Sequence, residues 1–385
     1  MFSAIVLLGL QISHVRAADP PAAYRVGVAQ TDITPDYPIR LAGFGFRRAE
    51  SEGVTLPIHA KALAIDDGDP AVLITADLCG VPSAFTDALA KRLTAAGIKR
   101  DRFMLTVTHT HTAPMVKGYL PTLFGVPIPA EHQQHIDRFT GELLDKLERV
   151  ARAALADRKP AKLSWGVGKV GFAINRRDKG GPVDHDLPVL VVRDFDGQPR
   201  AIYASYACHC VTLSNNRISG DWAGFAQEAI QADFPGAIAL ISIGCGADQN
   251  PESGVTGDKV DVATAQGRAL AQEVNRLVNG WLAPITGKLT ANASTFDLPL
   301  IDPLPRTAWE EKVKQNGPES RSYAIGYHAQ VQLGRLDRSE SLPTNVPYRA
   351  QTWTFGDDLA MAFLPGEVVV DYSLRLKREL DARRL

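Results

Sequence analysis

The sequence predicts an α/β fold, a layered domain in which mixed β-sheet is flanked by helices and a metal site lies at the C-terminal ends of strands. Three observations lead to this prediction. Short runs rich in Val, Ile and Leu alternate with longer runs that carry apolar residues at helical spacing. Within 61–76 and 188–207, two strand-like runs follow each other without a helix, which indicates hairpins in a mixed sheet. Several of the apolar runs also end directly in His, Asp or Glu.

The individual elements follow from local pattern. The predicted helices are Ala84–Ala95, Gln133–Ala156, Trp222–Asp233, Val260–Val278 and Val368–Ala382. Gly97 stands where a helix-ending glycine is expected, and Asp221 where an N-cap is expected. We expect a return strand and loop over 284–304 and a helical excursion within the polar segment 303–349. The predicted strands are Tyr24–Val28, Lys61–Ile65, Ala71–Ala76, Phe103–Thr108, Pro188–Arg193, Ala201–Ala207, Ile238–Ile243 and Leu359–Phe363.

Composition places the chain among ordinary globular proteins. Of its 385 residues, 45% are hydrophobic and 22% charged, and the net charge is −1. This balance, with no Lys/Arg run, argues against nucleic acid as a partner. Residues 1–17 are predicted to be an export signal, because the apolar run 4–10 precedes a small-x-small site at 15–17, although no Lys or Arg precedes Arg16. We therefore expect a secreted or periplasmic protein with one domain over 18–385; the alternative is a cytoplasmic protein with an irregular N-terminal segment.

The four cysteines do not form a disulfide framework. Cys208 and Cys210 flank His209 on a predicted strand, so both thiols should point to the face opposite the imidazole. We expect buried free thiols, because a Cys-x-Cys metal site would need further ligands that the neighbouring sequence does not offer.

Polar residues suited to chemistry follow several predicted strands. Sites in α/β sheets assemble outside the carboxyl ends of strands. If these strands are neighbours, the polar residues meet at one rim of the sheet. They are Asp77, His109, His111, Asp248 and Glu367, while His209 ends a further strand.

Two imidazoles and a carboxylate form a donor set that catalytic zinc accepts, with one position left for water. His109, His209 and Glu367 supply such a set. His111 is then free to hydrogen-bond a substrate or to shuttle a proton. Each residue also has a purely structural interpretation: a satisfied histidine at a strand end, a buried helix cap for Asp77, or a turn residue favoured by the helix dipole for Glu367.

The order and spacing of these motifs resemble the N-terminal catalytic domain of the neutral/alkaline non-lysosomal ceramidases, from about Tyr24 to the end of the chain. That family consists of zinc amidohydrolases that cleave the N-acyl bond of ceramide. The matching motifs are Asp32-Ile33-Thr34-Pro35, Gly43-Phe44-Gly45, Thr108-His109-Thr110-His111-Thr112-Ala113-Pro114, Asn175-Arg176, Ile218-Ser219-Gly220-Asp221 and Leu364-Pro365-Gly366-Glu367.

The resemblance implies a site and a substrate. A lipid amide similar to ceramide would be the substrate, with transient contact to a membrane surface. Zn²⁺ would be the cofactor, and a guanidinium or an amide would stabilise the developing oxyanion. The implied metal ligands are His109, His209 and Glu367, and the implied catalytic residues are His111, Asp77, Arg176 and Asn250.

The chain departs from the family pattern at two places. Asn250 stands where the family has a serine, and Tyr372 follows Glu367 too closely to be the family's fourth ligand, a tyrosine. The immunoglobulin-like domain that follows the catalytic domain in the family is not expected here. Two alternatives therefore stay open: a secreted, non-catalytic metal- or ligand-binding protein on the same fold, and a hydrolase of another small amide or ester.

Overall fold

The computed structural model describes residues 24–317, 320 and 322–380, so the predicted export signal at 1–17 lies outside the described residues. Its main element is a nine-stranded sheet with the order β4-β3-β2-β1-β5-β7-β8-β9 and with β11 beside β5. Strand pairs β3–β4 and β8–β9 are parallel and the other neighbours are antiparallel, so the predicted mixed sheet is confirmed. The strands are β1 (Tyr24–Asp32), β2 (His59–Asp66), β3 (Ala71–Ala76), β4 (Phe103–Val107), β5 (Lys159–Lys169), β7 (Asp186–Arg193), β8 (Pro199–Tyr206), β9 (Ile238–Ile243) and β11 (Ala283–Ile285).

The sheet curls, and this curvature brings its two ends together. The edge strands β4 and β9 contact each other although they lie at opposite ends of the strand order. One cluster of buried side chains fills the inner face and draws on both halves, with Leu73 from β3 and Leu240 from β9 among its members. Residues that alternate with these along the strands, such as Ile74 and Ile241, point to the outer face instead. Segments that follow β4 and β8 are therefore placed side by side.

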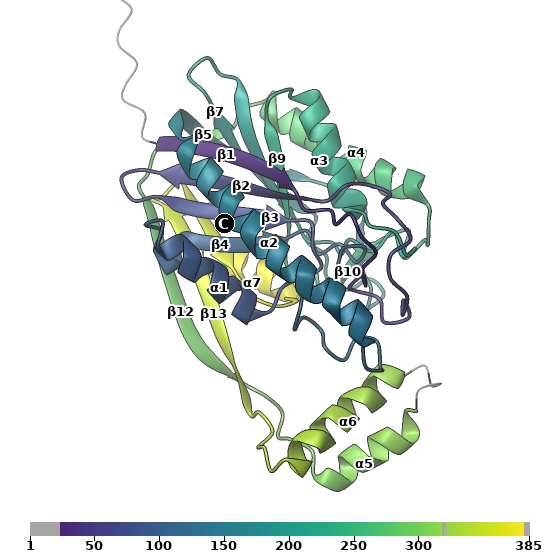
Figure 1. The fold of residues 1–385 in the computed structure, drawn as a ribbon. Coiled ribbons are helices and arrows are strands. Elements are labelled where there is room, and N and C mark those ends of the chain that lie inside the picture. Colours follow the sequence, from purple (N-terminus) through teal and green to yellow (C-terminus); the bar gives the residue numbers. More distant parts are fainter. Residues whose placement is uncertain (1–23, 318–319, 321, 381–385) are drawn as a thin grey trace, which may run out of the picture.

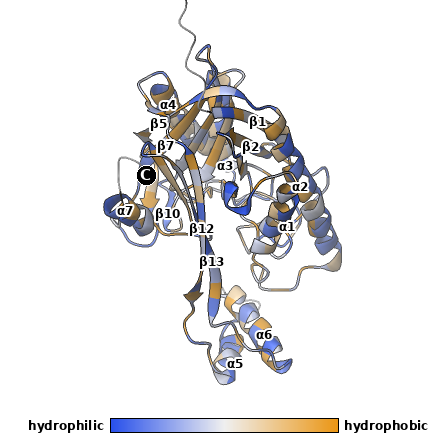
Figure 2. Cartoon of the chain, turned by 90° about the vertical axis from the view of Figure 1, so that its left-hand side faces the viewer, coloured by the Kyte–Doolittle hydropathy of each residue, from blue (hydrophilic) through white to orange (hydrophobic). Residues whose placement is uncertain are grey.

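Four helices cover the outer face. Helices α1 (Ser83–Thr94) and α2 (Ala130–Ala156) pack on the β1–β4 half, and α3 (Asp221–Asp233) and α4 (Val260–Val278) pack on the β5–β9 half. Figure 2 shows α1 and α2 on one side of the strands and α4 on the other. The predicted layered α/β architecture is thus confirmed, and all five predicted helices are present within two or three residues at each described end.

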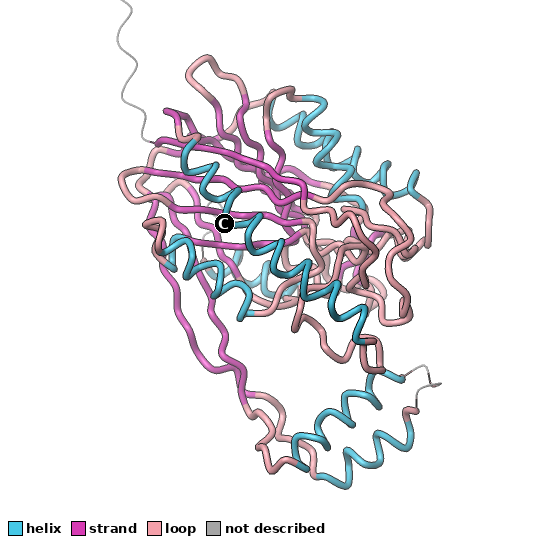
Figure 3. Tube along the Cα trace, in the orientation of Figure 1, coloured by secondary structure: helices cyan, strands magenta, loops and turns pink. Residues whose placement is uncertain are grey.

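A three-stranded sheet closes one end of the curled sheet and extends away from it as an arm. Its strands are β12 (Leu289–Pro299), β13 (Asn345–Phe355) and β14 (Leu359–Phe363), and the tip carries α5 (Arg306–Gln315) and α6 (Tyr323–Asp337). Figures 1 and 3 show this helical pair standing clear of the strands. The predicted excursion over 303–349 is correct for the two helices but wrong for its last part, because residues from Asn345 onward pair with β12. The exposure of most of β12 hides any alternating pattern.

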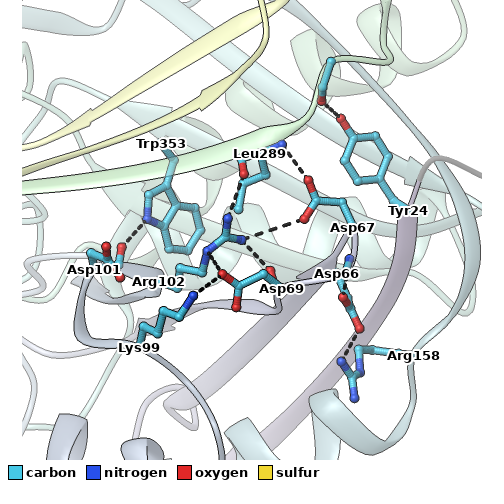
Figure 4. Close-up of polar contacts among 12 residues, drawn as sticks. Tyr24, Asp66, Asp67, Asp69, Lys99, Asp101, Arg102, Arg158, Leu289 and Trp353 are labelled. Carbon is cyan, nitrogen blue, oxygen red and sulfur yellow. Dashed lines mark hydrogen bonds and ion pairs between the residues drawn. The ribbon is translucent and has the colours of Figure 1, made fainter.

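A buried ion cluster anchors the root of the arm (Figure 4). The guanidinium of Arg102, in the short helix η1 (Arg100–Arg102), donates to Leu289 O at 2.8 Å and lies 3.8 Å from the carboxylate of Asp67. Asp67 accepts the Leu289 N–H at 2.8 Å, and Trp353 Nε1 donates to Asp101 O at 2.9 Å. Strands β12 and β13 are therefore tied to the main sheet through polar contacts as well as through the inner core.

Local details bear on two expectations, one for Asp221 and one for the cysteine pair. Helix α3 begins at Asp221 with Gly220 as its N-cap, so Asp221 is not the N-cap; it adopts φ +52° and its buried carboxylate accepts the N–H groups of Leu213 and Trp222. Cys208 and Cys210 are buried free thiols, as predicted. None of the described helices is both long enough and apolar enough to cross a bilayer.

Candidate metal centre

His109 lies in the turn that follows β4. Its backbone adopts φ +60°, a left-handed conformation that residues other than glycine rarely adopt. The residue is buried, and the tertiary packing around it holds this conformation. The ring Nδ1 lies 2.6 Å from the carbonyl oxygen of Cys79, so Nδ1–H donates to that oxygen. The second ring nitrogen, Nε2, consequently carries the lone pair and faces the interior of the site.

His209 follows β8 and is oriented in the same way. Its Nδ1 lies 2.7 Å from Gly246 O, in the turn after β9, and 3.2 Å from the carbonyl oxygen of Gln249, the residue that follows this turn. Trp222 Nε1 on α3 donates to the His209 carbonyl at 2.9 Å and fixes the backbone. With Nδ1 taken up by these carbonyls, the buried Nε2 is the ring nitrogen that faces the interior of the site.

Glu367 reaches these two histidines from the loop between β14 and α7 (Val370–Glu379). Its carboxylate oxygens lie 3.7 Å from His109 Nε2 and 3.4 Å from His209 Nε2. The neighbouring His209 imidazole lowers the pKa of the Glu367 carboxyl to about 2, and burial lowers the pKa of His109 to about 4. Near neutral pH the group thus presents an ionised carboxylate and a neutral imidazole, the protonation states that a metal ion requires.

These three side chains fit a metal ion. Their donor atoms all lie within 4.8 Å of one another, and both imidazoles point a bare nitrogen inward from a carbonyl-bound ring, the arrangement seen for metal-ligating histidines. Cys79, His109 and His111 also lie close enough to be grouped. That second group fits poorly, because burial raises the pKa of the Cys79 thiol to about 12 and the thiol faces Nδ1 of His109, the nitrogen already bound to a carbonyl.

His111 lies beside the His109, His209 and Glu367 side chains. Its Nε2 is 3.2 Å from His109 Nε2, and the ring of Phe44 packs against its ring with centroids 5.0 Å apart. Arg47 donates to the His111 carbonyl oxygen, and no local motif marked this arginine in the sequence. Burial holds the pKa of His111 well below its usual range, so the imidazole is neutral near neutral pH.

Of the three remaining predicted residues, Arg176 lies at Glu367, Asn250 lies on a strand beside the Arg176 segment, and Asp77 is bonded elsewhere. Arg176 Nη2 lies 4.0 Å from Glu367 and donates to Ala247 O at 2.6 Å. Asn250 lies on β10 (Gln249–Pro251), which pairs with β6 (Ala173–Asn175) directly before Arg176, and its Oδ1 is buried without a partner among the described residues. The Asp77 carboxylate instead accepts the His59 N–H and the Gln227 amide of α3, both at 2.9 Å.

The sequence also matches a known family. Residues 24–239 match the family model described as neutral/alkaline non-lysosomal ceramidase, N-terminal. The chain belongs to this family. The resemblance seen in the motifs is therefore confirmed.

Ceramidases are also found among curated proteins and solved structures. Two relatives from Dictyostelium discoideum, neutral ceramidases A and B, are 23% and 22% identical over 256 and 243 residues. Neutral ceramidase from Pseudomonas aeruginosa has the same fold, with a TM-score of 0.72 at 19% identity and 94% of this chain covered. A ceramidase solved in complex with C2 superposes with a TM-score of 0.71 at 18% identity, again over 94% of this chain.

The chain spans only part of these relatives. The matches cover 60% and 54% of this chain but 35% and 31% of the Dictyostelium proteins, and 65% and 66% of the two solved chains. The likeness to the solved structures therefore establishes the fold.

Proposed function

We propose that this ceramidase-family protein is a zinc-dependent amidohydrolase that cleaves the N-acyl bond of ceramide or of a related lipid amide. One observation carries the proposal: His109 and His209 each bind a carbonyl through Nδ1 and turn a bare Nε2 towards the Glu367 carboxylate. This donor set is the one that zinc takes in hydrolases. Zinc held there supplies a Lewis acid for an amide carbonyl and lowers the pKa of water.

The chain's own residues would perform the remaining tasks. His111 is buried, and its Nε2 lies 3.2 Å from His109 Nε2, so it is placed to assist proton transfer between the attacking water and the departing amine. Arg176 uses one nitrogen of its guanidinium on Ala247 O and has other N–H groups to offer to a developing oxyanion. Asn250 sits on the strand beside it, with an unpartnered amide oxygen available to orient a polar substrate group.

An apolar surface next to His111 supports a lipid substrate. Phe44 packs on the His111 ring and stacks against Phe46 with ring centroids 5.3 Å apart, and Phe46 is 62% exposed. A large aromatic side chain left in water beside a polar centre is a typical feature of a binding surface for an apolar group. An acyl or sphingoid chain would cover Phe46 while the amide lies at the histidines.

Metal analysis together with turnover tests this proposal. Purified protein is expected to bind about one zinc per chain, and Glu367→Gln or His209→Gln should remove the metal and the hydrolysis of a labelled N-acylsphingosine. His328→Gln is the matched control, because His328 lies on α6 and bonds Gln332. Zinc binding that survives in both site variants would refute the metal assignment. Zinc-loaded protein that hydrolyses a short amide or ester but no lipid amide would refute the substrate, and zinc binding without any turnover would favour a binding protein.

We also propose that residues 1–17 direct export and are removed before Ala18. The apolar run at 4–10 and the small-x-small site at 15–17 support this. Terminal sequencing of the protein recovered outside the cytoplasm is expected to begin at Ala18. Recovery of the intact chain only from the cytoplasm would refute export.

A further inference from the structure

Glu367 comes from a loop and its side chain is 47% exposed, so packing around the side chain does little to fix it. The hydrogen bonds of the neighbouring backbone groups set its position instead. One residue after it, the Val368 carbonyl accepts the Ala247 N–H at 3.0 Å. Three residues after it, the Val370 N–H donates to Asp248 Oδ1 at 2.9 Å. Both contacts come from the turn that follows β9, so this turn holds the segment that carries the carboxylate.

The burial and the negative charge of Asp248 suit it to hold the segment that carries Glu367. It is only 5% exposed, and its carboxylate accepts the first N–H of α7, a helix terminus where negative charge is favourable. Its second oxygen lies 3.4 Å from the Asn175 amide, and its carbonyl oxygen accepts the Arg176 N–H at 2.8 Å. One residue thus joins the α7 terminus to the segment that carries Arg176.

The same turn orients His209. Gly246 O and Gln249 O bind its Nδ1, and Gln249 O also accepts the His209 N–H at 2.9 Å. Displacement of Asp248 would therefore move the carboxylate relative to an imidazole that is itself held by adjacent peptide groups. The same turn therefore holds both residues between which the 3.4 Å distance is measured.

We propose that Asp248 is a positioning residue that sets the metal affinity of the site by capping α7 and so fixing Glu367. This inference rests on the proposed metal site. Asp248 does not touch the metal or the substrate; it acts through the Val370 N–H. Removal of such an outer partner typically weakens metal binding by about 10–100-fold.

Helix α7 has a second anchor that provides a matched control. Near its far end, Lys377 Nζ lies 2.8 Å from Asp184 and 2.9 Å from Asp186, and Ser373 Oγ donates to Asp184 at 2.5 Å. This cluster fastens the helix to the start of β7 through contacts separate from the Val370–Asp248 hydrogen bond. Lys377→Met should therefore loosen α7 and destabilise the fold while the Asp248 cap stays in place.

Competition with a chromophoric chelator, measured at equilibrium on the full chain, tests the proposal. Asp248→Ala is expected to lower zinc affinity by at least about tenfold, whereas Lys377→Met should change it by less than about threefold at a comparable loss of stability. Asp248→Asn keeps an oxygen for the Val370 N–H, so it should bind zinc nearly as tightly as the wild type. If Asp248→Ala does not fold, Asp248→Glu replaces it, because the added methylene displaces the cap and should also weaken binding.

Two results would overturn the inference. Wild-type affinity in Asp248→Ala, or in Asp248→Glu where that variant replaces it, would show that the cap does not set the position of Glu367. An equal loss in Lys377→Met would show that general loosening of α7 is responsible. A wild-type chain that binds no zinc would overturn the proposed function together with this inference, whereas tight wild-type binding with an unaffected Asp248 variant overturns the inference alone.

Discussion

Replacing Gly43 with alanine is expected to disable the site by displacing His111. Gly43 adopts φ +91°, and a Cβ added there would lie 2.4 Å from His111 Cγ. Carbon atoms in contact prefer separations of roughly 3.5–4.0 Å, so the ring and the loop must move apart by about 1 Å. A displacement of that size at a reacting group can cost about 100-fold in rate.

Gly97 provides the control for the cost of the backbone conformation. It adopts φ +87°, nearly the same angle, but a Cβ there meets no heavy atom within 4 Å. Alanine at either position should therefore cost about 1–2 kcal/mol of stability from the left-handed conformation alone. Any difference between the two variants beyond that amount reports the contact with His111.

The assay is kcat/KM on an N-acylsphingosine, with zinc content and urea unfolding measured in parallel. We expect Gly43→Ala to lose about 100-fold in kcat/KM and to keep its zinc, since the ligands are unchanged, and Gly97→Ala to keep both. Equal activity in the two variants would refute the close approach of the Gly43 backbone to a catalytic His111. Loss of zinc in Gly43→Ala would show instead that the displacement reaches the metal ligands.

Three further predictions concern binding, stability and pH. Phe46→Ser should lower kcat/KM by about tenfold or more for a long-chain lipid amide but leave kcat/KM for a two-carbon acyl analogue unchanged, since only a long chain covers this ring. An equal effect on both substrates would contradict the role of Phe46 in binding the lipid chain. Arg102→Met should lower the free energy of unfolding in urea by about 3–5 kcal/mol, because it leaves the buried Asp67 carboxylate without its cation. Lys99→Ala should lower it by under about 1 kcal/mol, because the Lys99 side chain is 66% exposed. Burial raises the pKa of Asp221 to about 7, so the folded state binds a proton that the unfolded state releases above about pH 4. The stability of wild type relative to Asp221→Asn should therefore rise, by at most about 1.4 kcal/mol per pH unit, as the pH falls from about 7 towards 4; a flat difference would show that Asp221 is ionised in the fold.

The local pattern was sufficient for most of the regular elements. Four elements begin and end at the predicted residues: strands β3, β9 and β14 and helix α4. Each is an apolar run with clear strand or helix spacing, and the residues on either side of it do not continue that spacing. Strand β13 was missed because most of its first half is exposed on the arm and shows no alternation of buried and exposed residues. Its pairing with β12 depends on contacts made across about fifty intervening residues.

Residue identity also pointed to the chemistry of the site, since few side chains can bind a metal ion or carry a proton near neutral pH. It could not separate Asp77 from the others, because an aspartate after a strand serves equally well as a catalytic group or as an acceptor for buried donors. The tertiary structure places the Asp77 carboxylate against His59 and Gln227, and it places Arg176 beside Glu367.

The sequence by itself determined the family, the donor types and the strand ends that carry them. Only the tertiary structure decided that His109 and His209 face each other, because their meeting requires the sheet to curl until β4 touches β9. It also decided which nitrogen of each ring is free, because the groups that bind Nδ1 are backbone carbonyls of Cys79, Gly246 and Gln249. Every residue carries such a carbonyl, so its position can be known only from the path of the folded chain.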